Sequence, residues 1–304
     1  MRHIAFLLMV SVLLAGCVQI PGQQAQQSTG AAVVNVSQNA TASQVNITQT
    51  QQNVTVQVNQ TTGTTSTTTT TQSDALSAIS SSEVSFKTKD SWIIYGTHYR
   101  SINANPKVGI ILLHELGANR SSFDLLIPVL HETLPDADIL VIDTRGHGES
   151  TNLGKYTKFT LAGDYRAMVN DIKGARDYLA FFRNLQDFYV VGASIGSSSA
   201  ISFGAEDSSI QKIVMLSPGM DYKGVDITEP LEDYHKYLLI VAADEDEQSA
   251  KDAQAAYSAS DSDAGLKKLL IYDDIGSAHG TEMFDASEDS ADGELTEIIA
   301  DWLK

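Results

Sequence analysis

The sequence predicts an α/β fold: an eight-stranded, mostly parallel sheet with helices on both faces and a minimal cap. The first observation is a set of six short, continuous apolar runs, which are typical of strands buried on both faces. The second is that helical patterns lie between these runs, an alternation that produces parallel strands joined by right-handed crossovers. The runs are Val108–Leu113, Ile139–Ile142, Phe188–Val191, Ile213–Leu216, Tyr237–Val241 and Leu269–Tyr272.

Two further strands precede these six. Glu83–Lys87 and Trp92–Arg100 alternate between apolar and polar side chains, as half-buried strands do, and the turn Lys89-Asp90-Ser91 joins them as a hairpin. The hairpin and the six runs together give eight strands.

Helices are predicted where apolar residues recur three and four positions apart. The clearest pattern runs from Leu161 to Phe182. The other predicted helices are Ser122–Glu132, Gly196–Ala205, Ser249–Ala259 and Gly293–Leu303.

The composition changes near residue 80 and divides the chain into three parts. We predict a signal peptide at residues 1–16, a stalk at 17–80 and one folded domain at 81–304. The stalk consists mostly of Gln, Thr, Ser, Asn and Val, and it has too little apolar area to offset the entropy of ordering, so we expect it to be disordered. Its Val-Asn-Val and Val-Thr-Val-Gln-Val alternations could form strands, but we expect extended chain because no apolar partner face is nearby.

The first residues have the pattern of an export signal. Arg2 is followed by the apolar segment Ile4–Leu14, which is too short to cross a bilayer comfortably, and then by Leu14-Ala15-Gly16-Cys17. The last four residues resemble the lipobox of prokaryotic lipoproteins. The resemblance implies that Cys17, the single cysteine, becomes the lipidated N-terminus and holds the chain at the outer face of the cytoplasmic membrane. An ordinary secretory leader ending in cysteine is the alternative.

Five Asn-x-Ser/Thr sequons cluster in the stalk, which indicates a glycosylated spacer. A glycosylated surface lipoprotein with a Thr-rich stalk resembles the surface lipoproteins of archaea. The sequons are at Asn35, Asn39, Asn46, Asn53 and Asn59.

Net charge and missing motifs exclude several classes of function. The net charge of -18 disfavours nucleic acid and anionic membrane surfaces as partners, so we expect membrane contact only through the lipid. The sequence has no glycine-rich phosphate loop, no dinucleotide fingerprint and no Cys/His metal cluster. We therefore expect no cofactor and no metal. We also expect the domain to be monomeric.

The strongest local signal for chemistry is Gly192-Ala193-Ser194-Ile195-Gly196. It follows an apolar strand and precedes a helix of small residues, which is the context that a nucleophilic serine requires. The turn should project the Ser194 hydroxyl above the sheet. The amide of Ile195 and the N-terminus of the helix should then face a developing oxyanion.

Two more loops carry a resemblance to a known superfamily. The segment from His114 to Arg120 resembles a His-Gly-x-Gly-x-Asn loop, and the segment from Asp143 to Ser150 matches an Asp-x-Arg-Gly-His-Gly-x-Ser loop. With the serine motif, they make residues 83–304 similar to the α/β-hydrolase superfamily, especially its compact esterase, dienelactone hydrolase-like and serine aminopeptidase-like members. The resemblance implies that Leu116 supplies the second oxyanion-hole amide and that the Asp143 loop is structural. Glu115 stands where the family usually has glycine.

The superfamily order of serine, acid and histidine implies the other two catalytic residues. Of the two histidines after Ser194, His279 lies in a loop after the last strand, where the family places its base, whereas His235 lies in an acidic stretch before a strand. For the acid, the family pattern points to Asp246, with Asp244 as the rival. A cation site at these acids is disfavoured because no glycine-containing calcium loop follows.

These residues predict a cell-surface serine hydrolase that forms an acyl-enzyme. Small esters are the leading substrate, with thioesters or short peptides behind. The segment at 218–237, where relatives insert a lid, is short, so we expect an open site. Met220 and Tyr222 could line an acyl pocket or could equally pack against the sheet. A transferase with another acyl acceptor remains an alternative, and so does a non-catalytic surface-binding protein on the same fold.

Overall fold

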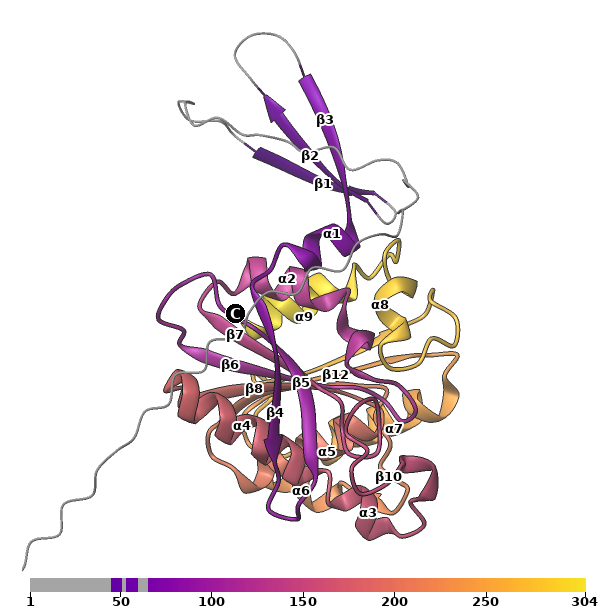
Figure 1. Ribbon diagram of the computed structural model, residues 1–304. Coiled ribbons are helices and arrows are strands. Elements are labelled where there is room, and N and C mark those ends of the chain that lie inside the picture. The colour runs from indigo at the N-terminus through magenta and orange to yellow at the C-terminus, as the bar shows by residue number, and fades with distance from the viewer. Residues whose placement is uncertain (1–44, 51–52, 60–64) are drawn as a thin grey trace, which may run out of the picture. The chain divides into compact units, whose positions relative to one another are not determined.

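The computed structural model describes residues 45–50, 53–59 and 65–304 (Figure 1). Its main sheet has eight strands in the order β13-β12-β9-β8-β6-β7-β5-β4. β4 and β5 form an antiparallel hairpin, β5 is antiparallel to β7, and the other neighbours are parallel, which confirms the predicted sheet. The strands are β4 (Ser81–Lys87), β5 (Ile93–Tyr99), β6 (Val108–Leu113), β7 (Ala137–Ile142), β8 (Asp187–Ala193), β9 (Ile210–Leu216), β12 (Tyr237–Ala243) and β13 (Lys267–Tyr272).

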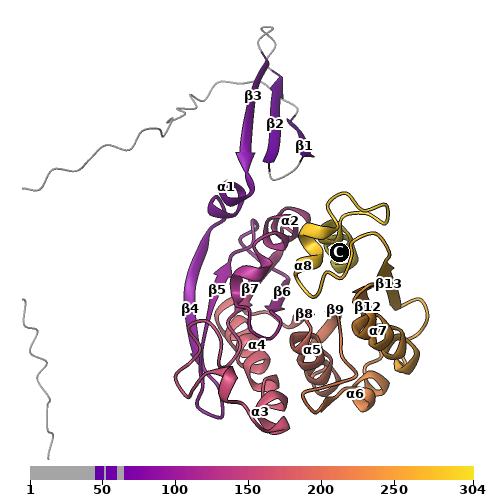
Figure 2. The same ribbon diagram turned by 90° about the vertical axis from the view of Figure 1, so that its right-hand side faces the viewer.

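Helices cover both faces of this sheet (Figure 2). One face carries α3 (Ala162–Arg166), α4 (Val169–Arg183), α5 (Ile195–Glu206), α6 (Thr228–Asp233) and α7 (Glu247–Ala259). The other face carries α2 (Leu126–Thr133), α8 (Glu282–Ala286) and α9 (Leu295–Leu303). The predicted minimal cap, between β9 and β12, consists of α6 and the two-residue strands β10 (Asp221–Tyr222) and β11 (Val225–Asp226).

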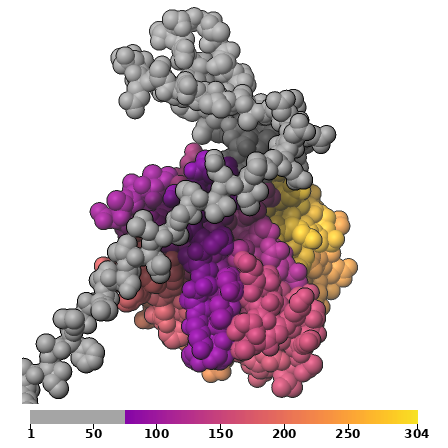
Figure 3. All heavy atoms as spheres, viewed as in Figure 1, coloured from indigo at the N-terminus to yellow at the C-terminus, as the bar shows by residue number. Residues whose placement is uncertain are grey.

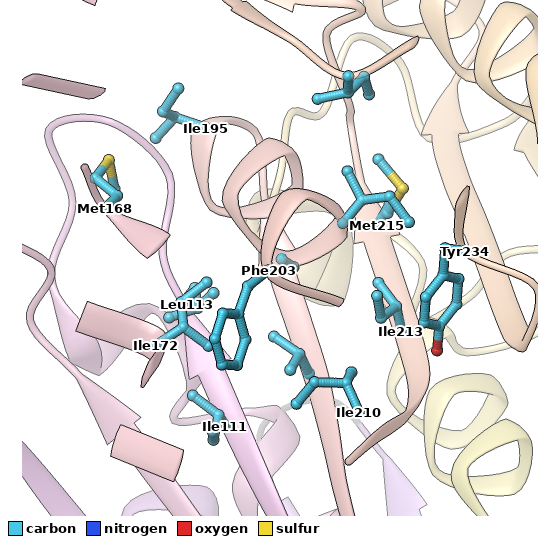
Figure 4. Packing of buried hydrophobic residues seen from close by; sticks show 14 of the residues in the cluster. Ile111, Leu113, Met168, Ile172, Ile195, Phe203, Ile210, Ile213, Met215 and Tyr234 are labelled. Atoms are coloured by element: carbon cyan, nitrogen blue, oxygen red, sulfur yellow. The ribbon is translucent and has the colours of Figure 1, made fainter. Parts of the chain in front are cut away.

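The core has two layers because side chains along a strand point alternately to opposite faces. In β6, Ile111 and Leu113 join the layer under α4 and α5, whereas Ile110 and Leu112 join the layer under α2 and α9. Figure 4 shows the first layer, in which Phe203 of α5 lies among strand and helix residues. Each fully buried Leu, Ile or Phe contributes about 1.5–3 kcal/mol, so the continuous apolar runs of the central strands stabilise both layers at once.

The helix predicted at Leu161–Phe182 is instead two helices, α3 and α4. The turn between them uses hydrogen bonds three residues apart, from Met168 N–H to the Tyr165 carbonyl and from Asp171 N–H to the Met168 carbonyl. This tight turn keeps Met168 in the core and Asp171 beside Arg145. A 3.6-residue pattern continues through such a turn, so the sequence does not reveal the break.

Three segments of the predicted stalk form an antiparallel sheet, where we expected disordered, extended chain. They are β1 (Val45–Thr50), β2 (Asn53–Asn59) and β3 (Thr65–Thr71). Valine and threonine favour extended backbone, and pairing satisfies the main-chain hydrogen bonds without an apolar face.

The packed part of the domain also begins before the predicted boundary at residue 81. Helix α1 (Gln72–Ser77) and the turn after it place Leu76 and Ile79 against the core layer under α2 and α9.

The predicted leader, Cys17, Asn35 and Asn39 lie outside the described residues, whereas Asn46, Asn53 and Asn59 fall within β1 and β2. None of the described helices is long and apolar enough to cross a membrane.

The two ends of the sheet are β4 and β13, and β4 is visible at the surface in Figure 3. Side chains of β4 alternate between exposed and half-buried. Glu83 of this strand pairs with Arg120 at 2.8 Å.

A buried ion pair attaches α4 to the loop after β7. The Arg145 guanidinium donates to both carboxylate oxygens of Asp171, with Nη2 at 2.7 Å and Nε at 3.0 Å from Oδ1, and both side chains are almost fully buried. Arg145 also donates to Asp90 at 2.6 Å and lies over the Trp92 ring. The Asp143–Ser150 loop is thus held to the β4–β5 hairpin and to α4, in agreement with the structural role that the resemblance implies.

Replacing Asp171 with alanine should leave Arg145 charged and buried with only its partly exposed partner Asp90. Removing one member of a buried pair costs about 3–5 kcal/mol. We expect Asp171→Ala to lower the free energy of unfolding by that amount in a urea titration. Asp177→Ala, on the same helix, removes surface pairs with Lys173 and Arg176 and should cost about 1 kcal/mol or less. Equal effects of the two changes would contradict this interpretation.

Candidate active site

Ser194 lies in a strained turn between β8 and α5. Its φ is 51° and its ψ is -116°, a combination that residues with a side chain rarely adopt. The Ser194 N–H donates to the Leu216 carbonyl at 2.8 Å, and the Ser194 carbonyl accepts from the Ser197 N–H at 2.9 Å. Within residues 65–304 no group hydrogen-bonds to the Ser194 hydroxyl, and Ser194 is one of the residues that line a cavity.

The two glycines of the motif allow this turn because strand, helix and loop approach closely. A Cβ atom at Gly192 would lie 2.6 Å from the backbone nitrogen of Ser197. A Cβ atom at Gly196 would lie 2.5 Å from the Leu113 carbonyl oxygen and 3.0 Å from that of His114. The second contact places the loop after β6 directly against the start of α5.

The two candidate oxyanion-hole amides are in these adjoining segments. Ile195 is the first residue of α5, and Leu116 is in the loop after β6. Among the described residues, neither backbone N–H donates a hydrogen bond to another group. Both amides are therefore free to bind an acceptor, as an oxyanion hole requires.

Two buried histidines hold the loop that contains Leu116. His114 Nδ1 donates to the Glu115 carbonyl at 2.7 Å, and His147 Nε2 accepts from the Gly117 N–H at 3.1 Å. Burial and the neighbouring His147 lower the pKa of His114 to about 4, and burial lowers the pKa of His147. Both rings are therefore neutral near pH 7, and each offers a lone pair to a backbone N–H.

His279 and Asp246 are hydrogen-bonded to each other. The distance from His279 Nδ1 to Asp246 Oδ2 is 2.6 Å, and the Ser249 hydroxyl lies 3.4 Å from the same nitrogen. Asp246 immediately precedes α7. The rival Asp244 is exposed and its side chain makes no hydrogen bond to His279. With Nδ1 donating to the carboxylate, Nε2 is left as the basic nitrogen.

The loop that carries His279 is anchored on three sides. The His279 N–H donates to Glu282 Oε2 at 3.2 Å, and the Gly280 N–H donates to the Ser217 hydroxyl at 2.9 Å. The Thr281 hydroxyl donates to the Glu115 carboxylate, at 2.9 Å from Oε1. Sequence reasoning missed Ser217, Ser249 and Thr281. Their only signal was position, since each follows a parallel strand or is one helical turn or less from a candidate catalytic residue.

Ser194, Asp246 and His279 border one open cavity of about 370 Å³, whose lining does not include Ile195 or Leu116. Tyr222 is among its lining residues, as predicted, whereas Met220 packs against the core layer under α4 and α5. The lining residues are Ser194, Ser217, Pro218, Gly219, Asp221, Tyr222, Asp246, Gln248, Ser249, Asp252 and His279.

One group of described side chains has the spacing of a metal site, and all three of its members are exposed carboxylates: Asp273, Asp274 and Asp292. Exposed acidic groups of this kind are common without an ion, so they carry no assignment.

Comparison with known proteins identifies the family. A family model described as serine aminopeptidase, S33 (Hydrolase_4) matches residues 104–263, more than half of the chain. The chain belongs to this serine aminopeptidase S33 family. The matched segment begins before β6, contains Ser194 and Asp246, and ends before His279. Membership in this hydrolase family and the observed sheet confirm the predicted α/β-hydrolase fold.

Solved structures resemble this S33 family member in fold. The Pyrococcus furiosus esterase Pf2001 matches with a TM-score of 0.62 and 17% identity, over 77% of this chain and 93% of that one. The dienelactone hydrolase from Anabaena variabilis matches with a TM-score of 0.59 and 18% identity, over 74% and 97%. The esterase domain of a Rhodothermus marinus protein matches with a TM-score of 0.54 and 12% identity, over 73% and 97%. No curated protein has a significant sequence match.

Replacing Gly192 with alanine should disrupt the Ser194 turn, since the new methyl group would meet the backbone of α5. Overpacking of this kind costs about 1–3 kcal/mol. We expect Gly192→Ala to lower the urea midpoint by a corresponding amount. Gly163→Ala is the matched control because a Cβ atom there meets nothing within 4 Å. A Gly192→Ala protein as stable as the control would show that the turn tolerates a side chain.

Proposed function

We propose that the domain is a serine hydrolase that cleaves carboxylic esters through an acyl-enzyme. The observation that carries the proposal is the 2.6 Å hydrogen bond between His279 and Asp246 at a cavity that Ser194 also borders. Membership in a hydrolase family supports it. A serine hydroxyl is a weak nucleophile, and a base held by a carboxylate is what activates it.

In the proposed reaction, His279 Nε2 accepts the hydroxyl proton as Ser194 Oγ bonds to the ester carbonyl carbon. The tetrahedral intermediate collapses when its bond to the alcohol oxygen breaks, and the imidazolium returns the proton to that oxygen. Water then attacks the acyl carbon with His279 again as the base, the bond from that carbon to Ser194 Oγ breaks, the carboxylic acid leaves, and the imidazolium returns the proton to Oγ. Asp246 holds the ring in the required tautomer and stabilises the imidazolium.

The Ile195 and Leu116 amides are our proposed oxyanion hole. Each free N–H would donate to the oxygen that gains negative charge in the tetrahedral intermediate. Loss of one such donor typically costs about 10²–10³-fold in kcat. The neutral His114 and His147 hold the Leu116 loop without adding charge that changes near pH 7.

We propose small, uncharged esters as the substrates. The cavity of about 370 Å³ admits a compact acyl group, and Tyr222 offers it an aromatic surface. Besides Asp246, two carboxylates border the cavity, Asp221 and Asp252, and its lining includes no lysine or arginine. These carboxylates would repel an anionic acyl group in the cavity, whereas they would not repel a neutral one.

Peptide hydrolysis is the second candidate because the matched family is described as serine aminopeptidase. The same groups would act on an amide, and His279 would protonate the leaving amine. A thioesterase, an acyltransferase with another acceptor, and a binding protein without turnover are further alternatives.

We also propose that the enzyme is a lipid-anchored cell-surface protein. This rests on the leader, on Cys17 and on the sequon cluster between Asn35 and Asn59. The anchor would be the acyl chains on Cys17, and the residues before the domain would act as a spacer.

The first test is hydrolysis of p-nitrophenyl acetate and butyrate by the purified protein. We expect Ser194→Ala to lower kcat/KM at least about 10³-fold, and Asp246→Asn at least about 10²-fold, because the histidine then loses its tautomer and its counter-charge. Asp244→Asn is the matched control and should stay within about twofold.

Turnover that survives Ser194→Ala would exclude the proposed nucleophile. A larger loss of kcat/KM in Asp244→Asn than in Asp246→Asn would assign the role of catalytic acid to Asp244. A folded wild-type protein with no turnover and no fluorophosphonate label on Ser194 would favour the binding protein.

The acidic lining predicts discrimination by charge. We expect kcat/KM for mono-p-nitrophenyl succinate to be about tenfold or more below that for p-nitrophenyl butyrate at low salt. The ratio of the two kcat/KM values should move toward one as salt screens the carboxylates. Asp252→Asn should also bring the ratio of the two kcat/KM values closer to one. Asp263 does not border the cavity, so Asp263→Asn should leave this ratio unchanged. Equal rates for the two esters at low salt would contradict this part of the proposal.

A further inference from the structure

The side chain of Glu115 bridges two loops that are far apart in sequence. Its carboxylate accepts the Thr281 hydroxyl, at 2.9 Å from Oε1 and 3.1 Å from Oε2. The two residues are 166 positions apart. Thr281 is buried and immediately precedes α8, so its hydroxyl has a fixed position from which to donate.

Gly280 lies where these two loops come close to a third segment, the end of β8. Its φ is +60°, and a Cβ atom there would lie 3.3 Å from Glu115 Oε2 and 3.4 Å from the Ala193 Cβ. Three segments thus lie close together at Gly280, a place called the junction below: the loop after β6, the end of β8 and the loop that carries His279.

Each proposed catalytic group is one residue from this junction. Leu116 follows Glu115, Ser194 follows Ala193, and His279 precedes Gly280. Any change in how the three segments meet therefore changes the distances between the nucleophile, the base and the oxyanion amide. Such displacements are costly, since a shift of about 1 Å can lower a rate about 10²-fold.

The side chain of Glu115 would be harmful if it were free. A carboxylate beside the Leu116 amide would oppose the negative charge of an oxyanion if it turned toward that amide. The Thr281 hydroxyl holds the carboxylate on the side of the His279 loop. The backbone of Glu115 is held separately, through its carbonyl, by His114.

We propose that Glu115 is a positioning residue: through its hydrogen bond to Thr281 it sets the spacing between His279 and the oxyanion loop. The inference goes beyond the proposed ester hydrolysis, because it concerns an arrangement that any acyl transfer at this site would use.

The test compares variants that keep or remove the bond in the full-length protein. We expect Thr281→Val and Glu115→Ala each to lower kcat about tenfold with little change in KM, because binding is kept and alignment is lost. Thr281→Ser keeps the hydroxyl and Glu115→Gln keeps an acceptor, so both should stay within about threefold of wild type. The double variant should be no slower than either single one, since both changes remove the same contact.

The matched control is another threonine–glutamate bond. Thr296 Oγ1 donates to Glu294 Oε1 at 2.6 Å. Thr296 is buried, like Thr281, but it lies at the start of α9 and does not line the cavity. Thr296→Val should leave kcat unchanged at temperatures where the protein is folded. Equal losses in Thr296→Val and Thr281→Val would mean that only general stability is measured.

A second measurement does not depend on turnover. The Nδ1 proton that His279 shares with Asp246 should give a downfield NMR signal, assigned by its loss in Asp246→Asn. We expect Thr281→Val to shift or broaden this signal and Thr281→Ser to keep it. An unchanged signal together with unchanged kcat in Thr281→Val would overturn the inference. Absence of Ser194-dependent turnover in the wild type would instead count against the proposed function, and the NMR signal would still decide the role of Glu115.

Discussion

The backbone of Ser194 adopts a conformation that costs about 1–3 kcal/mol for a residue with a side chain, and the surrounding structure must maintain it. The hydrogen bonds to Leu216 and Ser197 hold the turn from both sides. Gly192 and Gly196 let β8, α5 and the loop after β6 approach to a distance that no larger residue permits. The close approach that makes the turn possible also brings the carbonyls of Leu113 and His114, at the start of the loop that contains Leu116, to the start of α5. One steric constraint thus brings together the segments that carry the proposed nucleophile and the proposed oxyanion hole.

The parallel sheet supplies the remaining groups. Because the loops that follow parallel strands emerge at the same edge, residues after β6, β8, β9, β12 and β13 converge although up to 166 positions separate their contacts. Asp246, Ser217 and His279 each come from a different one of these loops. Because the loops lie close together, short side chains are enough to connect them. The Gly280–Ser217 and Thr281–Glu115 hydrogen bonds each join two loops.

Much of this arrangement follows from sequence, for reasons that differ between its parts. Buried strands such as Val108–Leu113 are continuous apolar runs because both faces need apolar side chains, so β6 agrees with its prediction in both bounds. The motif around Ser194 was visible because its steric demands admit few residues. Thr281 and Ser217 were not visible, since a hydroxyl that anchors a loop has no pattern of its own and is recognised only by its partner in space. The tight turn between α3 and α4 and the pairing of β1, β2 and β3 were missed for a related reason: local patterns do not record which hydrogen bonds a backbone finally makes.

The two ends of the sheet have a consequence for self-association. A strand at the edge of a sheet leaves main-chain groups that a second copy could pair with, and proteins oppose this with charged side chains. β4 carries Glu83 and Lys87, and β13 carries Lys267 and Lys268. Joining β13 to its counterpart in another copy would bring the lysines of the two copies together, on top of the repulsion between two chains of net charge -18. Pairing between two copies through the β13 edge is therefore opposed by charge.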